Sequence, residues 1–130
     1  MGDDGWSRTG SRKSTTPAYL CTDVNSALNL EVMKTKVHRQ FVIGGASLYA
    51  ETLALPPTST FVDRVLLTRI LSPAFEDCDV YMPDFISEKW RRASHEELAE
   101  WTGVDVPEGA QEENGVKYEF QMWIRGEDVV

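Results

Sequence analysis

The stretch that most constrains the fold runs from Phe41 to Leu53, where an apolar run meets two adjacent glycines. Residues 41–43 are continuously apolar, which is typical of a strand covered on both faces. Gly44 and Gly45 predict a tight turn, and residues 46–53 repeat apolar side chains at helical spacing. A strand, a turn and a helix in this order leave backbone N–H groups at a helix N-terminus, where a pyrophosphate can bind. A glycine pair at this place can also serve only the close packing of a strand on a helix.

Further strands and helices are indicated on both sides of this stretch. The apolar patterns predict strands over residues 18–21, 39–43, 63–70 and 116–125 and helices over residues 22–31 and 46–53. Strands that alternate with helices are typical of an open α/β sheet whose early strands are parallel. The alternating final strand, which follows the Asn114-Gly115 turn signal, favours an antiparallel edge.

Charge excludes some classes of partner. The 130-residue chain carries a formal net charge of −8, and its Lys and Arg residues do not cluster beyond Arg91-Arg92. General binding to nucleic acid or to an anionic membrane is therefore not expected. A phosphate-bearing ligand would need a local basic or backbone site, because the overall field opposes it.

Cysteine and histidine are too few for a disulfide framework or a zinc site. The two cysteines, Cys21 and Cys78, are far apart, and His38 and His95 are the only histidines. These numbers indicate free thiols in a reducing compartment and no metal site. The sequence shows neither a secretory signal nor a long apolar run, so we expect a cytoplasmic protein, with the mitochondrion as the alternative.

Four blocks of the sequence resemble dihydrofolate reductase, in that enzyme's order and at about its spacing. They are Phe41–Tyr49, Asp63–Ile70, Asp77–Pro83 and Gln111–Phe120, and the last looks like the eukaryotic, fungal form. The resemblance covers only the C-terminal portion of that enzyme. It implies a partial α/β fold with a mixed sheet, two flanking helices and an antiparallel C-terminal strand. Residues 18–125 would form this incomplete domain, residues 1–17 an irregular leader and residues 126–130 a tail.

The resemblance also decides an ambiguous region. Trp90–His95 is expected to be a strand with a loop soon after it, as in the family. Ser94 and Glu97 nevertheless have the spacing of a helix capping box, which favours a short helix from about Glu96 to Trp101. We predict the strand.

The resemblance implies an NADPH-dependent reductase that converts 7,8-dihydrofolate to tetrahydrofolate. Gly44 and Gly45 would share a cis peptide bond and let the pyrophosphate and the nicotinamide ribose approach the backbone. Ile43 would offer its main-chain carbonyl to the pterin and the nicotinamide, and Tyr49 would line their junction. The implied cofactor-binding residues are Ile43, Gly44, Gly45, Ala46, Ser47, Leu48, Tyr49 and Arg8, and the implied substrate-binding residues are Ile43, Tyr49 and Thr68.

Two of these assignments rest on matches outside the glycine stretch. Ser7-Arg8 resembles the pair that holds the phosphate by which NADPH differs from NADH. Thr68 resembles the threonine that hydrogen-bonds the catalytic carboxylate. Asp79 and Val80 would border the active-site loop, with Val80 where the family usually has threonine.

The family's helix bearing the catalytic carboxylate has no counterpart in this sequence. No catalytic residue is therefore assigned, and the 130-residue chain alone is expected to show no measurable reductase activity. A non-catalytic remnant that binds cofactor or a partner is the first alternative. The pyrimidinone reductase of riboflavin synthesis is the second. A complete enzyme of this kind would be a monomer, with no nucleic-acid or membrane partner.

Overall fold

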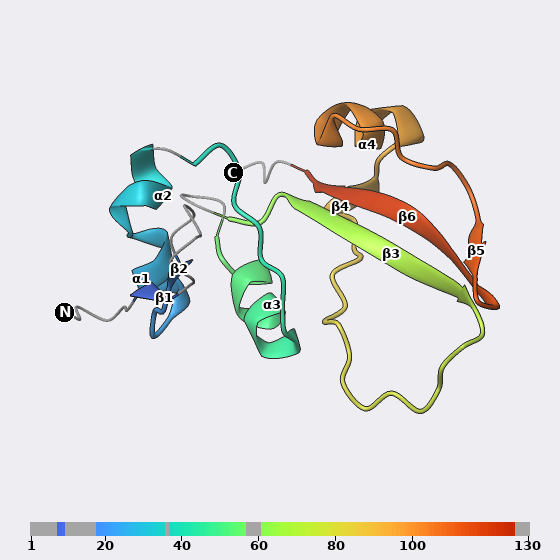
Figure 1. Ribbon diagram of the computed structural model, residues 1–130, viewed down its shortest axis with the longest axis horizontal. Coiled ribbons are helices and arrows are strands. Elements are labelled where there is room, and N and C mark those ends of the chain that lie inside the picture. Colours follow the sequence, from blue (N-terminus) through green and yellow to red (C-terminus); the bar gives the residue numbers. More distant parts are fainter. Residues whose placement is uncertain (1–7, 10–17, 36, 57–60, 127–130) are drawn as a thin grey trace. The chain divides into compact units, whose positions relative to one another are not determined.

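The computed structural model describes residues 8–9, 18–35, 37–56 and 61–126 (Figure 1). The chain divides into two compact units, residues 1–43 and 44–130. The first unit holds β1 (Arg8–Thr9), β2 (Ala18–Tyr19), α1 (Val24–Leu28) and α2 (Glu31–Thr35). The second holds α3 (Ala46–Leu53), β3 (Arg64–Ser72), β4 (Trp90–Arg92), α4 (His95–Thr102), β5 (Gln111–Glu113) and β6 (Val116–Arg125).

In the first unit, two short helices replace the single helix predicted over residues 22–31. Asp23 caps α1, because its carboxylate accepts a hydrogen bond from the Ser26 N–H at 2.7 Å. This bond also lowers the pKa of Asp23 below its usual value. Asn29 ends α1, since its N–H turns back to the carbonyls of Asn25 and Ala27. β2 is shorter than the strand predicted over 18–21, and it pairs antiparallel with β1, within the stretch expected to be an irregular leader.

The second unit is built on β6. Its strand order is β3–β6–β4, and β5 also pairs with β6, so that every described strand of this sheet contacts β6 and all pairs are antiparallel. Asn114 and Gly115 join β5 to β6 with φ angles of 51° and 79°, as the turn signal predicts. β5 was not predicted, because Gln111–Glu113 has no apolar residue and becomes a strand only through this hairpin.

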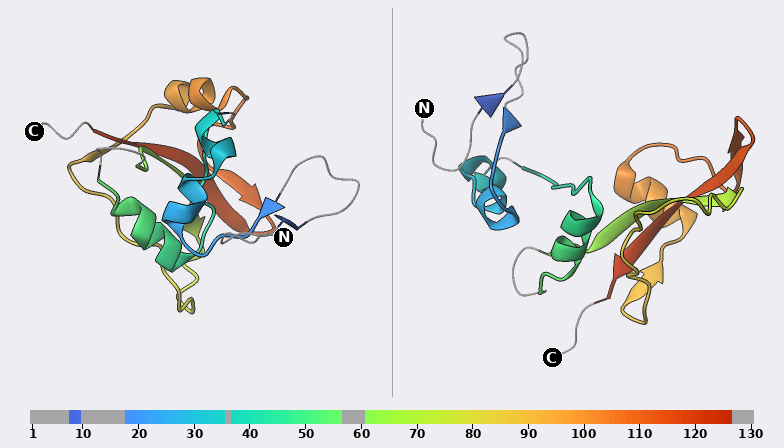
Figure 2. Two further views of the ribbon diagram at one scale, coloured as in Figure 1. Left: turned by 90° about the vertical axis from the view of Figure 1, so that its left-hand side faces the viewer. Right: turned by 90° about the horizontal axis from the view of Figure 1, so that it is seen from below.

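The hydrophobic core of this unit lies between β6 and α4. Met122 is 1% exposed and clusters with Ala93 and Leu98. Trp101, Val106 and Ile124 pack against the cluster. Figure 2 shows α4 beside one face of the sheet from two further directions. The alternation predicted for β6 is confirmed at its centre, where Met122 and Ile124 contribute to the core.

On the opposite face of β6 the polar side chain of Gln121 is buried. Its amide donates to the Glu119 carboxylate at 2.8 Å, and its carbonyl oxygen accepts from the Trp123 indole at 2.9 Å. The Trp123 ring packs against Phe85 at 6.1 Å between centroids. Gln121 can be buried because both ends of its amide are hydrogen-bonded.

One strand prediction is wrong throughout. Residues 39–43 form no strand, and Phe41 and Ile43 are exposed. An apolar run becomes a strand only where a neighbouring strand takes up its backbone hydrogen bonds. The early parallel pairing expected through this run is therefore not seen among the described strands. The α/β class with an antiparallel C-terminal strand is confirmed.

The strand predicted over Trp90–His95 is confirmed for Trp90–Arg92 and wrong beyond it, where the local capping signal was right. β4 ends at Arg92, and α4 begins at His95 with Ser94 as its N-cap. The Ser94 hydroxyl accepts from the Glu97 N–H at 3.1 Å, and the Glu97 carboxylate accepts from the Ser94 N–H at 3.0 Å.

Among the described helices, none has the length and hydrophobicity to cross a bilayer.

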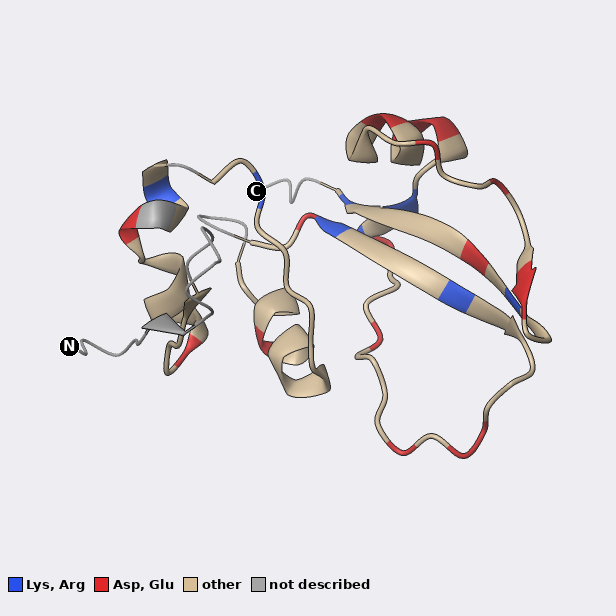
Figure 3. Cartoon of the chain, viewed as in Figure 1, with Lys and Arg blue, Asp and Glu red and all other residues tan. Residues whose placement is uncertain are grey.

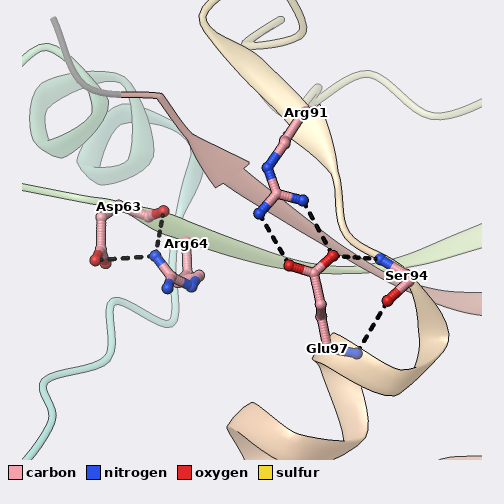
Figure 4. Close-up of polar contacts among 5 residues, drawn as sticks. All are labelled: Asp63, Arg64, Arg91, Ser94 and Glu97. Atoms are coloured by element: carbon pink, nitrogen blue, oxygen red, sulfur yellow. Dashed lines mark hydrogen bonds and ion pairs between the residues drawn. The ribbon is translucent and has the colours of Figure 1, made fainter.

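Glu97 is held by Arg91 as well as by the cap (Figure 4). The Arg91 guanidinium donates two hydrogen bonds to its carboxylate, at 3.0 and 2.9 Å. These bonds, followed by the bond from the Ser94 N–H, lower the pKa of Glu97 to about 2. The pair ties the end of β4 to the first turn of α4.

This tie predicts a pH dependence of stability. Because the pKa of Glu97 is lower in the folded chain than its usual 4.5, its contribution is full above about pH 4.5 and is lost as the pH falls towards 2. The melting midpoint of Glu97→Gln is expected to lie below that of the wild type at pH 7 and to converge with it in acid. Thermal unfolding followed by circular dichroism across this range measures the difference. Glu100→Gln on the same helix is the control, and an unchanged gap at low pH would contradict the assignment.

Candidate functional site

The glycine pair has a backbone conformation that few other residues adopt. Gly44 has φ of 121°, and the peptide bond between Gly44 and Gly45 is cis. The cis bond that the family resemblance implies is therefore present. A φ in this region favours glycine, because a Cβ would crowd the neighbouring backbone.

Tyr49 lies over Gly44 from the first turns of α3. A Cβ on Gly44 would be 3.6 Å from the Tyr49 hydroxyl oxygen. The Tyr49 N–H donates to the Gly45 carbonyl at 2.9 Å, which is the first hydrogen bond of the helix. The structure therefore brings together three of the predicted residues, with the phenol hydroxyl beside the glycine turn.

Gly45 faces open space. It is the N-cap of α3, with φ of −99°, and a Cβ placed on it would have nothing within 4 Å outside its chain neighbours. The first turn of α3 contains no acidic residue, and a glycine cap offers no side chain to the helix N–H groups. The first N–H groups of a helix have no carbonyl partner within the helix. Those of Ala46, Ser47 and Leu48 can therefore bind an anion.

Thr52 is a positioning residue that was not singled out from the sequence. It is 4% exposed, and its hydroxyl donates to the carbonyl of Leu48 at 2.8 Å, with a longer contact to that of Tyr49 at 3.3 Å. A buried threonine one turn after Leu48 thus holds the residues that face the glycine turn. Its place on the apolar side of the helical repeat is the signal that could have identified it.

The remaining predicted residues belong to other elements of the chain. Arg8 is in β1 of the first unit, and Ile43 is the last residue of that unit, directly before Gly44 in the sequence, with its side chain exposed. Thr68 is exposed on β3, opposite Phe120 of β6. Their roles in binding stay predictions.

Asp79 and Val80 belong to the segment that joins β3 to β4. Both are exposed, and this part of the segment contains neither helix nor strand. The Tyr81 hydroxyl donates to the Cys78 carbonyl at 2.6 Å, which is a local turn contact. Cys21 and Cys78 are both free, as predicted.

A glycine turn with open space at a helix N-terminus, on a chain that also builds a sheet, is typical of a nucleotide-binding α/β enzyme. The chain belongs to the dihydrofolate reductase family, whose family model matches residues 7–125. The match includes the glycine turn, α3 and all four strands of the second unit.

Fungal and animal relatives agree with this assignment. The chain is 42% identical over 128 residues to the dihydrofolate reductase of Cryptococcus neoformans, covering 79% of this chain and 55% of the relative. It is 37% identical over 95 residues to that of Pneumocystis carinii, covering 69% and 43%. The pig enzyme (Sus scrofa) is 32% identical over 108 residues, covering 81% and 51%. The chain spans about half the length of these curated relatives.

Proposed function

We propose that this chain takes part in the NADPH-dependent reduction of 7,8-dihydrofolate to tetrahydrofolate. Its residues form part of the surface that binds the cofactor. The family and its named relatives support the reaction. The observation that carries the proposal is the Gly44-Gly45 turn, with Tyr49 over one glycine and open space beside the other. We further propose that the small-molecule substrate is dihydrofolate, that the location is cytoplasmic with the mitochondrion as the alternative, and that a complete enzyme of this kind is a monomer.

The residues of α3 fit the phosphate part of a dinucleotide. Unpaired N–H groups of Ala46, Ser47 and Leu48 would hold the pyrophosphate by charge-assisted hydrogen bonds, and the Ser47 hydroxyl would add one more. The open position at Gly45 would admit the nicotinamide ribose. Bound NADPH supplies the hydride, and the protein supplies position and electrostatics.

Tyr49 and Ile43 would lie where the cofactor meets the substrate. The Tyr49 hydroxyl can donate a hydrogen bond and present its ring edge, and Thr52 fixes the helix turn that carries it. The Ile43 carbonyl would accept from the pterin amino group, and Thr68 would hydrogen-bond on the substrate side. Arg8 would bind the phosphate that distinguishes NADPH from NADH.

A titration tests the cofactor site. NADPH is expected to bind the purified chain saturably, with a change in its fluorescence, and NADH more weakly. Ser47→Ala is expected to weaken NADPH binding by roughly threefold to tenfold, the range of one ordinary hydrogen bond. Ser26→Ala, in the other unit, is the matched control. No fluorescence change at millimolar NADPH would reject the proposal.

Turnover is a separate measurement. The expectation that the 130-residue chain alone does not measurably reduce dihydrofolate stays a prediction, and so does the alternative of a non-catalytic cofactor-binding module. Following NADPH consumption with dihydrofolate present tests both predictions. Cofactor binding without turnover favours the non-catalytic module, whereas rates near those of an ordinary reductase contradict it.

A further inference from the structure

Among the residues of α3, all of which the structure describes, only Thr52 is buried, and its side chain is polar. Its hydroxyl donates to the Leu48 carbonyl at 2.8 Å, and the longer contact to the Tyr49 carbonyl is 3.3 Å. Both carbonyls also accept the N–H group four residues on, as in any α-helix, so the hydroxyl is an additional donor. A threonine that bonds back in this way slightly destabilises and bends a helix. The helix therefore does not need this hydroxyl for its own stability.

The bond to Leu48 connects Thr52 to the glycine turn through two peptide groups, both of them trans. The Leu48 carbonyl and the Tyr49 N–H belong to one peptide group, and this N–H donates to the Gly45 carbonyl at 2.9 Å. The Gly45 carbonyl shares the second peptide group with the Ala46 N–H. Because the carbonyl and the N–H of a trans peptide point in opposite directions, the series of bonds from the Thr52 hydroxyl ends at the Ala46 N–H. That N–H is the first of the helix and has no carbonyl partner within it.

The helix supplies no positive side chain to an anion at this end. Its one charged residue is Glu51, and Figure 3 shows α3 without a basic position. Gly45 has no side chain to cap the first N–H groups. Binding of a pyrophosphate to α3 therefore depends on the strength and the direction of its backbone N–H donors. Hydrogen bonds in a series polarise one another, by about 10–30% per bond.

We propose that Thr52 is a positioning residue for the pyrophosphate of the cofactor, which it does not contact. Its hydroxyl polarises the series of bonds that ends at the Ala46 N–H and fixes the direction in which this donor points. Thr52 is 4% exposed, so water does not compete for its bond to Leu48. This inference rests on the proposed NADPH site and adds a residue that tunes the site from inside the fold.

Two substitutions of Thr52 separate binding from stability in the full 130-residue chain. Thr52→Val removes the hydroxyl and keeps the branched shape, and its affinity for NADPH in a fluorescence titration is expected to fall about twofold to fivefold. Its melting midpoint is expected to equal that of the wild type or exceed it, since both carbonyls keep their helical partners. Thr52→Ser keeps the hydroxyl and loses a buried methyl group. It should therefore bind NADPH as the wild type does and melt at a lower temperature.

The amide proton of Ala46 reports on this series of bonds without any ligand. Its NMR chemical shift in the free, isotope-labelled chain is expected to move upfield in Thr52→Val, because the N–H is then less polarised. The shift should stay near the wild-type value in Thr52→Ser. A threonine that only fills space would leave this shift unchanged in both variants.

Thr102 of α4 is the matched control. Its hydroxyl makes the same two kinds of contact, to the carbonyls of Leu98 at 3.0 Å and Ala99 at 3.2 Å. The start of α4, however, is capped by the Ser94 side chain and is not part of the proposed cofactor site. Thr102→Val is therefore expected to leave both NADPH affinity and the Ala46 shift unchanged.

Three results would overturn the inference while leaving the proposed function intact. The first is wild-type NADPH affinity in Thr52→Val. The second is an unchanged Ala46 shift in that variant. The third is a melting midpoint that falls together with the affinity, which would make the role of the hydroxyl purely structural. Failure of the wild type to bind millimolar NADPH would instead reject the proposed function, and this inference with it.

Discussion

Replacing Gly45 with alanine is expected to weaken NADPH binding about tenfold, or roughly 1.4 kcal/mol, with little change in stability. The fold has room for the new methyl group, since nothing lies within 4 Å of it, and a φ of −99° suits any residue. If the fold does not need glycine here, the open space is available to a ligand. The methyl group would then meet the bound cofactor.

Gly44→Ala is the matched comparison, because its effect is expected on folding first. The space beside Gly44 accommodates a Cβ at ordinary contact distance, 3.6 Å from the Tyr49 hydroxyl, but a φ of 121° disfavours alanine. A cost of about 1–3 kcal/mol in unfolding free energy is expected. Urea unfolding and NADPH titration of both variants separate the two effects. Wild-type affinity in Gly45→Ala would show that the glycine pair serves packing alone.

The elements predicted correctly are those whose pattern is complete within the element. α3 has a glycine cap, a helical repeat and prolines beyond its end, and β6 has ten residues of alternation after an Asn-Gly turn. β3 is nine residues of mostly apolar sequence and ends at Ser72 before a proline. In each case the local pattern and the final packing agree.

The wrong predictions depended on something outside the segment. Residues 41–43 have the composition of a buried strand, but only a neighbouring strand would make them one. Gln111–Glu113 has no strand pattern, yet the hairpin turn places it against β6. At Ser94 the local capping box outweighed the resemblance, because its two hydrogen bonds and the Arg91 pair form within seven residues.

The site could be predicted in part. The resemblance pointed to Gly44, Gly45 and Tyr49; the cis bond is confirmed, and the structure places the Tyr49 hydroxyl beside Gly44. No sequence pattern distinguishes the two glycines. In the structure, the positive φ of Gly44 favours glycine at that position, whereas Gly45 faces open space. That distinction depends on neighbours in three dimensions, as does the positioning role of Thr52.

Met122→Ala is expected to cause the largest loss of stability of any single change considered, about 2–5 kcal/mol in unfolding free energy. Met122 is the largest fully buried side chain described, at 1% exposure, and lies at the centre of the cluster with Ala93 and Leu98. Truncation removes buried apolar surface and leaves a cavity between β6 and α4 that a β-strand cannot collapse to fill.

Urea unfolding followed by circular dichroism measures this loss, and Leu66→Ala is the control. Leu66 stands directly opposite Met122 in the register of β3 and β6, but its side chain is 46% exposed. Its truncation is therefore expected to cost much less, about 1 kcal/mol or below. The comparison holds the face of the sheet, the register position and the residue volume nearly constant and varies burial. Equal losses in the two variants would mean that the surface of β3 bearing Leu66 is covered in solution, and that the core on this face extends beyond the cluster around Met122.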